Sequence, residues 1–88
     1  MMNPAALRIH GADTVATALR NLVAGEVVLG VTLSDAVPRA HKFALVAHAP
    51  GDPVLKFGFP IGQATAEIAP GDHVHVHNVA TALAGEAA

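Results

Sequence analysis

The sequence predicts a small all-β domain built from short strands and tight turns that contain glycine or proline. Its 88 residues are enough for one domain only. Three similar turn signals, Ala24–Val28, Pro50–Val54 and Pro70–Val74, divide the chain. Glycine supplies a positive φ and proline presets one turn position, so such a signal before β-branched residues is typical of a turn that leads into a strand.

Seven segments have the composition or the alternation of strands. In chain order they are Leu7–His10, Val15–Leu19, Val27–Leu33, Lys42–Ala47, Val54–Phe57, Gln63–Ile68 and His73–Val79. The stretch Asp13–Leu22 is ambiguous, because its apolar residues fit both a helical stripe and strand alternation. The regular spacing of the other segments favours a series of short meandering strands.

The connections and the ends of the chain complete this prediction. Gly58–Gly62 holds two glycines and a proline, which predicts a sharp turn or a bulge. Asp13 is expected to cap a turn. We expect one domain over residues 1–88, with residues 1–6 and 81–88 flexible.

Composition and charge exclude several classes of function. No apolar run reaches the roughly 18 residues that a membrane-spanning helix needs. Five basic and seven acidic residues give a net charge of −2, which offers no basic surface for nucleic acid. The chain has no cysteine, so disulfides and thiolate metal sites are excluded. The N-terminus lacks the pattern of a secretory signal, and a cytoplasmic location is expected.

The run His73–Asn78 contains three alternating histidines. On an extended backbone they would share one face at a spacing of about 6.5 to 7 Å, so two of them, but not three, could bind one metal ion. His75 and His77 could bind a metal ion or hold a substrate carboxylate, and a metal site would need other residues or another chain to complete it. The alternative is a half-exposed strand whose histidines merely alternate with core residues Val74 and Val76.

Three further polar residues are candidates for a site. His41 and Lys42 adjoin, so on a strand they point to opposite faces, and His41 is the better candidate for the site of the other histidines. Without further information, a solvated pair at the start of a strand is an equally good interpretation. Lys56 could bind an anionic substrate, although a lysine on an edge strand is more often a surface residue. His10 and His48 are expected at the surface.

From Asp13 onward, the order of motifs resembles the small SAF domain, a β-clip fold, of the altronate and galactarate dehydratase family. The matching segments are Asp13–Leu19, His41–Leu45, Gly51–Val54, Lys56–Gly58, Ile61–Gly62 and Ile68–Asn78. The ending Gly71–Asn78 closely matches the family pattern Gly-x-His/Tyr-Val-His-x-His-Asn. Two positions depart from the family: Ala40 stands where a glycine usually precedes the His-Lys pair, and Arg39 stands where an apolar residue is common.

The resemblance implies the small subunit of a lyase that eliminates water or sulfite from a hydroxy acid, as altronate dehydratase and sulfolactate sulfo-lyase do. It also implies a large catalytic partner subunit and a divalent metal ion, Fe²⁺ or alternatively Mn²⁺ or Zn²⁺. The chain alone is expected to be inactive and could form a homo-oligomer when isolated. A non-catalytic module that binds sugar acids or carbohydrates, or that only assists assembly, remains an alternative, because a fold does not fix a function.

Elimination of water next to a carboxylate needs a base for the α proton and an acid or a metal ion for the departing hydroxide. Together with the resemblance, this chemistry predicts roles for seven residues. They are catalysis by His41 and Lys42, metal binding by His75 and His77, and substrate binding by His73, Asn78 and Lys56.

Overall fold

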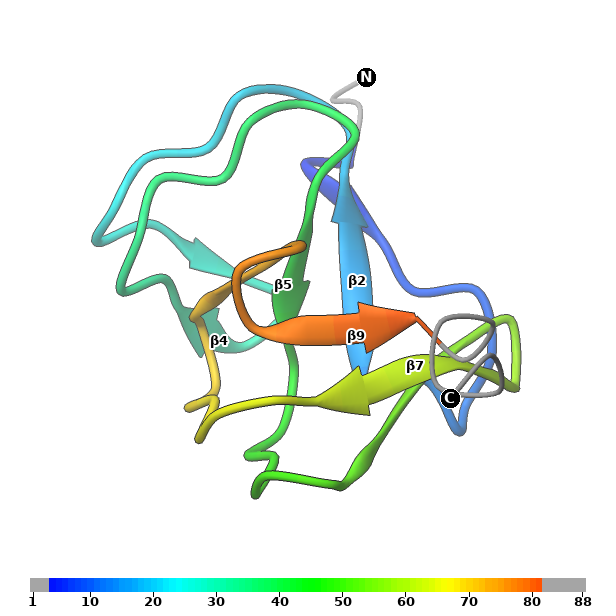
Figure 1. Ribbon diagram of the computed structural model, residues 1–88. Coiled ribbons are helices and arrows are strands. Elements are labelled where there is room, and N and C mark those ends of the chain that lie inside the picture. The colour runs from blue at the N-terminus through cyan, green and yellow to red at the C-terminus, as the bar shows by residue number, and fades with distance from the viewer. Residues whose placement is uncertain (1–3, 82–88) are drawn as a thin grey trace.

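The computed structural model describes residues 4–81, which form nine short β-strands and no helix (Figure 1). The small all-β domain predicted from the sequence is therefore confirmed. Of the flexible ends that we predict, residues 1–3 and 82–88 lie outside the described residues. The strands are β1 (Ala6–Leu7), β2 (Val15–Ala18), β3 (Val27–Val28), β4 (Val31–Thr32), β5 (Lys42–Ala44), β6 (Pro53–Lys56), β7 (Phe59–Ala64), β8 (His73–Val74) and β9 (Val79–Thr81).

The strands pair antiparallel in three small sheets. The orders are β1-β2-β5-β8, β6-β7-β9 and β3-β4. The ambiguous stretch Asp13–Leu22 thus contains a strand, β2, and no helix. Among the described residues, no helix is long and apolar enough to cross a membrane.

The four-stranded sheet separates two hydrophobic cores. Directly paired residues share a face and successive residues alternate, so β5 points Phe43 to one face and Lys42 to the other. Phe43 pairs with His73, and Lys42 pairs with Val74. The core on the Phe43 face contains Ala6, Ala16, Ala18, Leu22, Val28, Leu33, Val37 and Phe43. The core on the Val74 face contains Val15, Ala44, Val54, Ala64, Ile68 and Val74.

One turn pattern recurs four times with an acidic fourth residue. The carboxylate accepts a hydrogen bond from the N–H of the first residue, and the N–H of the acidic residue donates back to the carbonyl of the first. The acidic residues are Asp13, Glu26, Asp52 and Asp72. The third residue of the last three turns is a glycine at a φ of about 91° to 92°, a conformation that other residues rarely adopt. The three predicted turns and the predicted cap at Asp13 are therefore confirmed.

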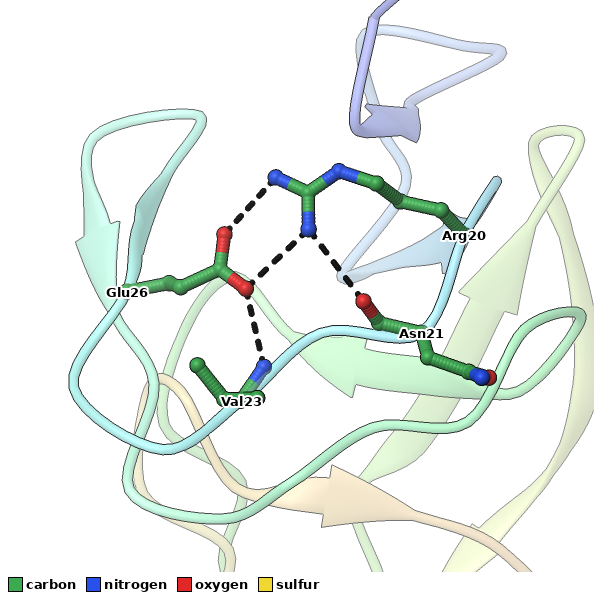
Figure 2. Close-up of polar contacts among 4 residues, drawn as sticks. All are labelled: Arg20, Asn21, Val23 and Glu26. Carbon is green, nitrogen blue, oxygen red and sulfur yellow. Dashed lines mark hydrogen bonds and ion pairs between the residues drawn. The ribbon is translucent and has the colours of Figure 1, made fainter.

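The turn at Glu26 carries an additional ion pair (Figure 2). The Arg20 guanidinium donates to both carboxylate oxygens of Glu26 at 3.1 and 2.8 Å, while the Val23 N–H donates to one of them at 2.9 Å. The hydrogen bonds from Arg20, followed by that from Val23, lower the pKa of Glu26 to about 2. The Arg20 side chain is 56% exposed, so the pair orders this loop but adds little stability.

All seven predicted strands have other limits in the structure; Leu7–His10, for example, is replaced by Ala6–Leu7. Val27–Leu33 is a hairpin, because Leu29–Gly30 adopt positive φ values of 52° and 78° and form a two-residue turn between β3 and β4. The strand predicted at Gln63–Ile68 instead spans Phe59–Ala64. Its pairing with β6 shifts register between Val54 and Leu55, which places a bulge within Gly58–Gly62, as predicted.

His48 lies in the core, and the prediction that it is a surface residue is wrong. It is 4% exposed and pairs with Ile68 through the backbone. Its Nε2 lies 2.8 Å from the hydroxyl oxygen of Thr14, which also accepts the N–H of Leu55. His48 directly precedes a turn, as the buried Leu22 and Ile68 do. In the three turns that contain glycine, the residue before the turn is buried whether it is apolar or, as His48, polar.

Candidate metal centre

The histidine run is broken by a turn. Strand β8 ends at Val74, residues 75–78 turn, and β9 begins at Val79. The Asn78 side-chain oxygen accepts the N–H of His75 at 3.0 Å, and the Asn78 N–H donates to the His75 carbonyl at 3.1 Å. Our prediction of one extended strand over His73–Val79 is wrong for this reason. Val76 is 80% exposed and not a core residue.

Strand pairing and this turn bring three imidazoles together. His41 precedes Phe43 by two residues and therefore shares its face with His73, the pairing partner of Phe43. His41 Nδ1 lies 2.8 Å from His73 Nε2, and the His41 and His75 rings stack with their centroids 4.2 Å apart. One nitrogen from each ring lies within 4.8 Å of the others. We call His41, His73 and His75 the histidine cluster.

The cluster is open to solvent on one side. His41 and His73 are half-buried, whereas His75 is exposed. Burial, followed by the charges on His41, His77 and His75, lowers the pKa of His73, and Asp35 opposes this shift. Neutral imidazole is the form that binds metal ions, so the packing favours the form of His73 that can act as a ligand.

His77 lies beside the cluster but is not a member of it. Its ring centroid is 5.4 Å from that of His73 at a tilt of 38°, and its side chain is exposed. The sequence-based prediction paired His75 with His77 and assigned His73 to substrate. The structure instead gathers His73 and His75 with His41, because the turn moves the run off a single strand face.

Lys42 and Lys56 do not join the histidine cluster. Lys42 is paired with Val74 on the opposite face of the four-stranded sheet. Burial, followed by the charge of Lys56, lowers the pKa of Lys42. The Lys56 ammonium lies 4.9 Å from the centroid of the Phe57 ring. Their roles in catalysis and in substrate binding stay predictions.

A strained turn leads into His41. The His41 N–H donates to the Pro38 carbonyl at 2.9 Å, and the Ala40 N–H donates to Ala18 at 2.9 Å. Ala40 adopts a φ of 73°, which favours glycine. A non-glycine residue therefore occupies this left-handed position, at a cost in backbone strain.

The histidine cluster fits a divalent metal ion. Two nitrogens bound at about 2.1 Å to one tetrahedral ion lie about 3.4 Å apart, and the three nitrogens lie within 4.8 Å of one another. Binding would move the His41 and His73 nitrogens, now 2.8 Å apart, slightly away from each other. An ion here would replace the proton shared by His41 and His73. Three imidazoles with an open side leave a position for an exogenous ligand.

Fold and site together define a class of protein: a small all-β domain that presents a histidine cluster at its surface. The protein-family model of the altronate/galactarate dehydratase SAF domain matches residues 4–82 of the sequence, and the chain belongs to this family. The resemblance inferred from the sequence motifs is thereby confirmed.

Curated relatives include complete enzymes and subunits. The chain is 49% identical over 81 residues to altronate dehydratase of Escherichia coli and 40% identical over 81 residues to altronate dehydratase of Bacillus subtilis. These matches cover 88% of this chain but 16% of each relative, so the chain spans about one sixth of their length. It is also 43% identical over 49 residues to (2R)-sulfolactate sulfo-lyase subunit alpha of Chromohalobacter salexigens, covering 56% of this chain and 52% of the relative. The chain is thus related to domains or subunits of larger lyases.

Proposed function

We propose that this chain is the small SAF component of a metal-dependent hydroxy-acid lyase and that it completes the active site of a larger catalytic partner. The reaction class is the elimination of water from a sugar acid or of sulfite from a sulfo-hydroxy acid. The relatives that carry the names altronate dehydratase and sulfolactate sulfo-lyase subunit alpha support this class. The convergence of three imidazoles on one open site is the observation that carries the proposal.

The proposed ligands of the metal are His41, His73 and His75, in place of the pair His75 and His77 that the sequence indicates. Fe²⁺ is the proposed ion, with Mn²⁺ or Zn²⁺ as alternatives, since imidazole binds all three. A bound divalent ion supplies Lewis-acid assistance to a departing hydroxide. The low pKa of His73 keeps a neutral nitrogen available for the ion.

The other polar residues have roles that follow from their positions. His77 is exposed beside the cluster, where it can contact the substrate or move a proton. Lys42 lies on the opposite face of the four-stranded sheet, and the charge of Lys56 is near enough to lower the pKa of Lys42, so the two lysines can bind an anionic group there. Besides His77, the Asp35 carboxylate lies next to the cluster, where it accepts the N–H of His73 at 3.2 Å. The partner is proposed to supply the remaining catalytic groups.

Activity of the reconstituted complex tests this proposal. We would co-express the chain with a candidate large lyase subunit and measure metal-dependent elimination from altronate, galactarate and sulfolactate. His41→Gln, His73→Gln and His75→Gln should each abolish turnover in an intact complex, and the exposed His10→Gln should not. Full activity of the cluster variants would overturn the proposal and favour a docking or sugar-acid-binding module. Turnover by the chain alone would contradict the need for a partner.

A further inference from the structure

The side chain of Asn78 connects two members of the histidine cluster. Its Oδ1 accepts the N–H of His75 at 3.0 Å, and its Nδ2 donates to the carbonyl of His73 at 2.9 Å. The carbonyl of His75 in turn accepts the N–H groups of Asn78 and Val79, each at 3.1 Å. Asn78 is 8% exposed, so its amide is engaged with backbone and directed away from solvent.

The other turns of the same pattern show what is particular to an asparagine here. At Asp13, Glu26, Asp52 and Asp72, the fourth residue is a carboxylate that accepts the N–H of the first residue. An acceptor is therefore all that this turn requires. A carboxylate at position 78 would close the turn equally well but would have no N–H for the His73 carbonyl. The amide thus adds one contact, and this contact reaches a residue of the cluster.

We infer that Asn78 is a positioning residue that fixes the spacing of His73 and His75 as metal ligands, and not a substrate-binding residue. This inference rests on the proposed metal site. The two hydrogen bonds hold the backbones of both residues to one rigid amide, so the two imidazoles emerge at a set separation while the chain reverses direction between them. Groups that orient metal ligands in this way typically change metal affinity about 10- to 100-fold when they are replaced.

Metal binding by the full chain separates this role from a purely structural one. Asn78→Asp keeps the acceptor that closes the turn and removes only the donor to His73. We would measure Zn²⁺ affinity by competition with a chromophoric chelator, the visible absorption of bound Co²⁺, and the fold of the metal-free variant by circular dichroism. Asp52→Asn, the reciprocal exchange in a turn outside the cluster, is the matched control. Asn78→Ala removes both contacts.

We expect Asn78→Asp to fold, to lose at least about tenfold in Zn²⁺ affinity and to alter the Co²⁺ spectrum, although its added negative charge attracts a cation. Asp52→Asn should match the wild type. Wild-type affinity and an unchanged spectrum in Asn78→Asp would overturn the inference and leave the proposed function intact. Loss of the fold in Asn78→Asp would also overturn it, because the amide would then support the domain as a whole. A wild-type chain that binds no Zn²⁺ or Co²⁺ would refute the metal site, and the inference with it.

Discussion

His48 is 4% exposed, with its ring beside the Thr14 hydroxyl, whereas the imidazoles of the histidine cluster face one another at an open surface. The buried ring occupies a place that Leu22 and Ile68 fill in the equivalent turns, so its surroundings are those of a core residue. In the cluster, the His41 and His73 rings lie within hydrogen-bond distance of each other and the His75 ring stacks on His41. The same side chain therefore supports the fold in one region and leaves its nitrogens available for a ligand in the other.

Replacing cluster residues should produce the largest effect on metal binding. His75→Gln and His41→Gln each remove one of three ligands. Changes at residues that only orient metal ligands weaken binding about 10- to 100-fold, so we expect at least a 100-fold weaker Zn²⁺ affinity here. Competition titration with a chromophoric chelator measures this change. His77→Gln, in the same turn but outside the cluster, is the control and should stay within a few-fold of the wild type. Equal losses in all three variants would erase the distinction between His77 and the cluster.

Replacing His48 should have the opposite profile. His48→Ala removes a buried ring and leaves the Thr14 hydroxyl without one partner, so we expect a loss of about 2 kcal/mol in the free energy of unfolding. Zn²⁺ affinity should not change. Urea denaturation followed by circular dichroism gives the stability of the variant. A variant that unfolds no more easily than the wild type would show that the buried His48 ring does not stabilise the core.

Relief of strain beside the cluster should have a smaller effect. Ala40→Gly places glycine where the backbone has a φ of 73°, so we expect a gain of about 1 kcal/mol. For a domain of this size, that gain corresponds to roughly 4 to 8 °C in melting temperature. Ala36→Gly, a change of the same kind at an exposed position without a positive φ, should not stabilise the chain. Destabilisation by Ala40→Gly would contradict the strained turn.

The smallest effect concerns pH. The pKa of His73 is lowered from its ordinary value of 6.5, so below pH 6.5 the unfolded chain takes up a proton before the folded chain does. The contribution of His73 to stability is therefore present at neutral pH and is lost as the pH falls from 6.5 through the folded-state pKa. Thermal melts of the metal-free chain between pH 8 and 5 should show a steeper decline for the wild type than for His73→Gln. Parallel profiles would mean that His73 titrates as an exposed histidine does.

The sequence predicts most of the fold because the turns carry explicit signals. Glycine followed by an acidic residue marks three turns, and the acidic side chains cap them as expected. The hairpin at Leu29 was missed because leucine rarely adopts a positive φ. The burial of His48 was missed because a polar residue gives no sign of a core position unless it is compared with Leu22 and Ile68.

The sequence predicts only part of the site, because the alternation of the histidines hides the turn that breaks their strand. Alternation in the run His73–Asn78 indicates an extended strand, and the competing turn depends on one amide, that of Asn78. The signal for this turn was the asparagine three residues after His75. In the other turns, the acidic residue likewise follows the first residue of the turn by three. The meeting of His41 with His73 depends on the pairing of β5 with β8, and local sequence does not encode that pairing.

The central claim, that His41, His73 and His75 form one metal site, is tested most directly by NMR of the imidazole nitrogens. We would titrate the ¹⁵N-histidine-labelled chain with Zn²⁺ and follow all six histidines. One nitrogen in each cluster residue should shift and saturate together at one equivalent, while His10 and His48 remain unchanged. Saturation at His75 and His77 without His41 would contradict the cluster and restore the site that the sequence alone indicates.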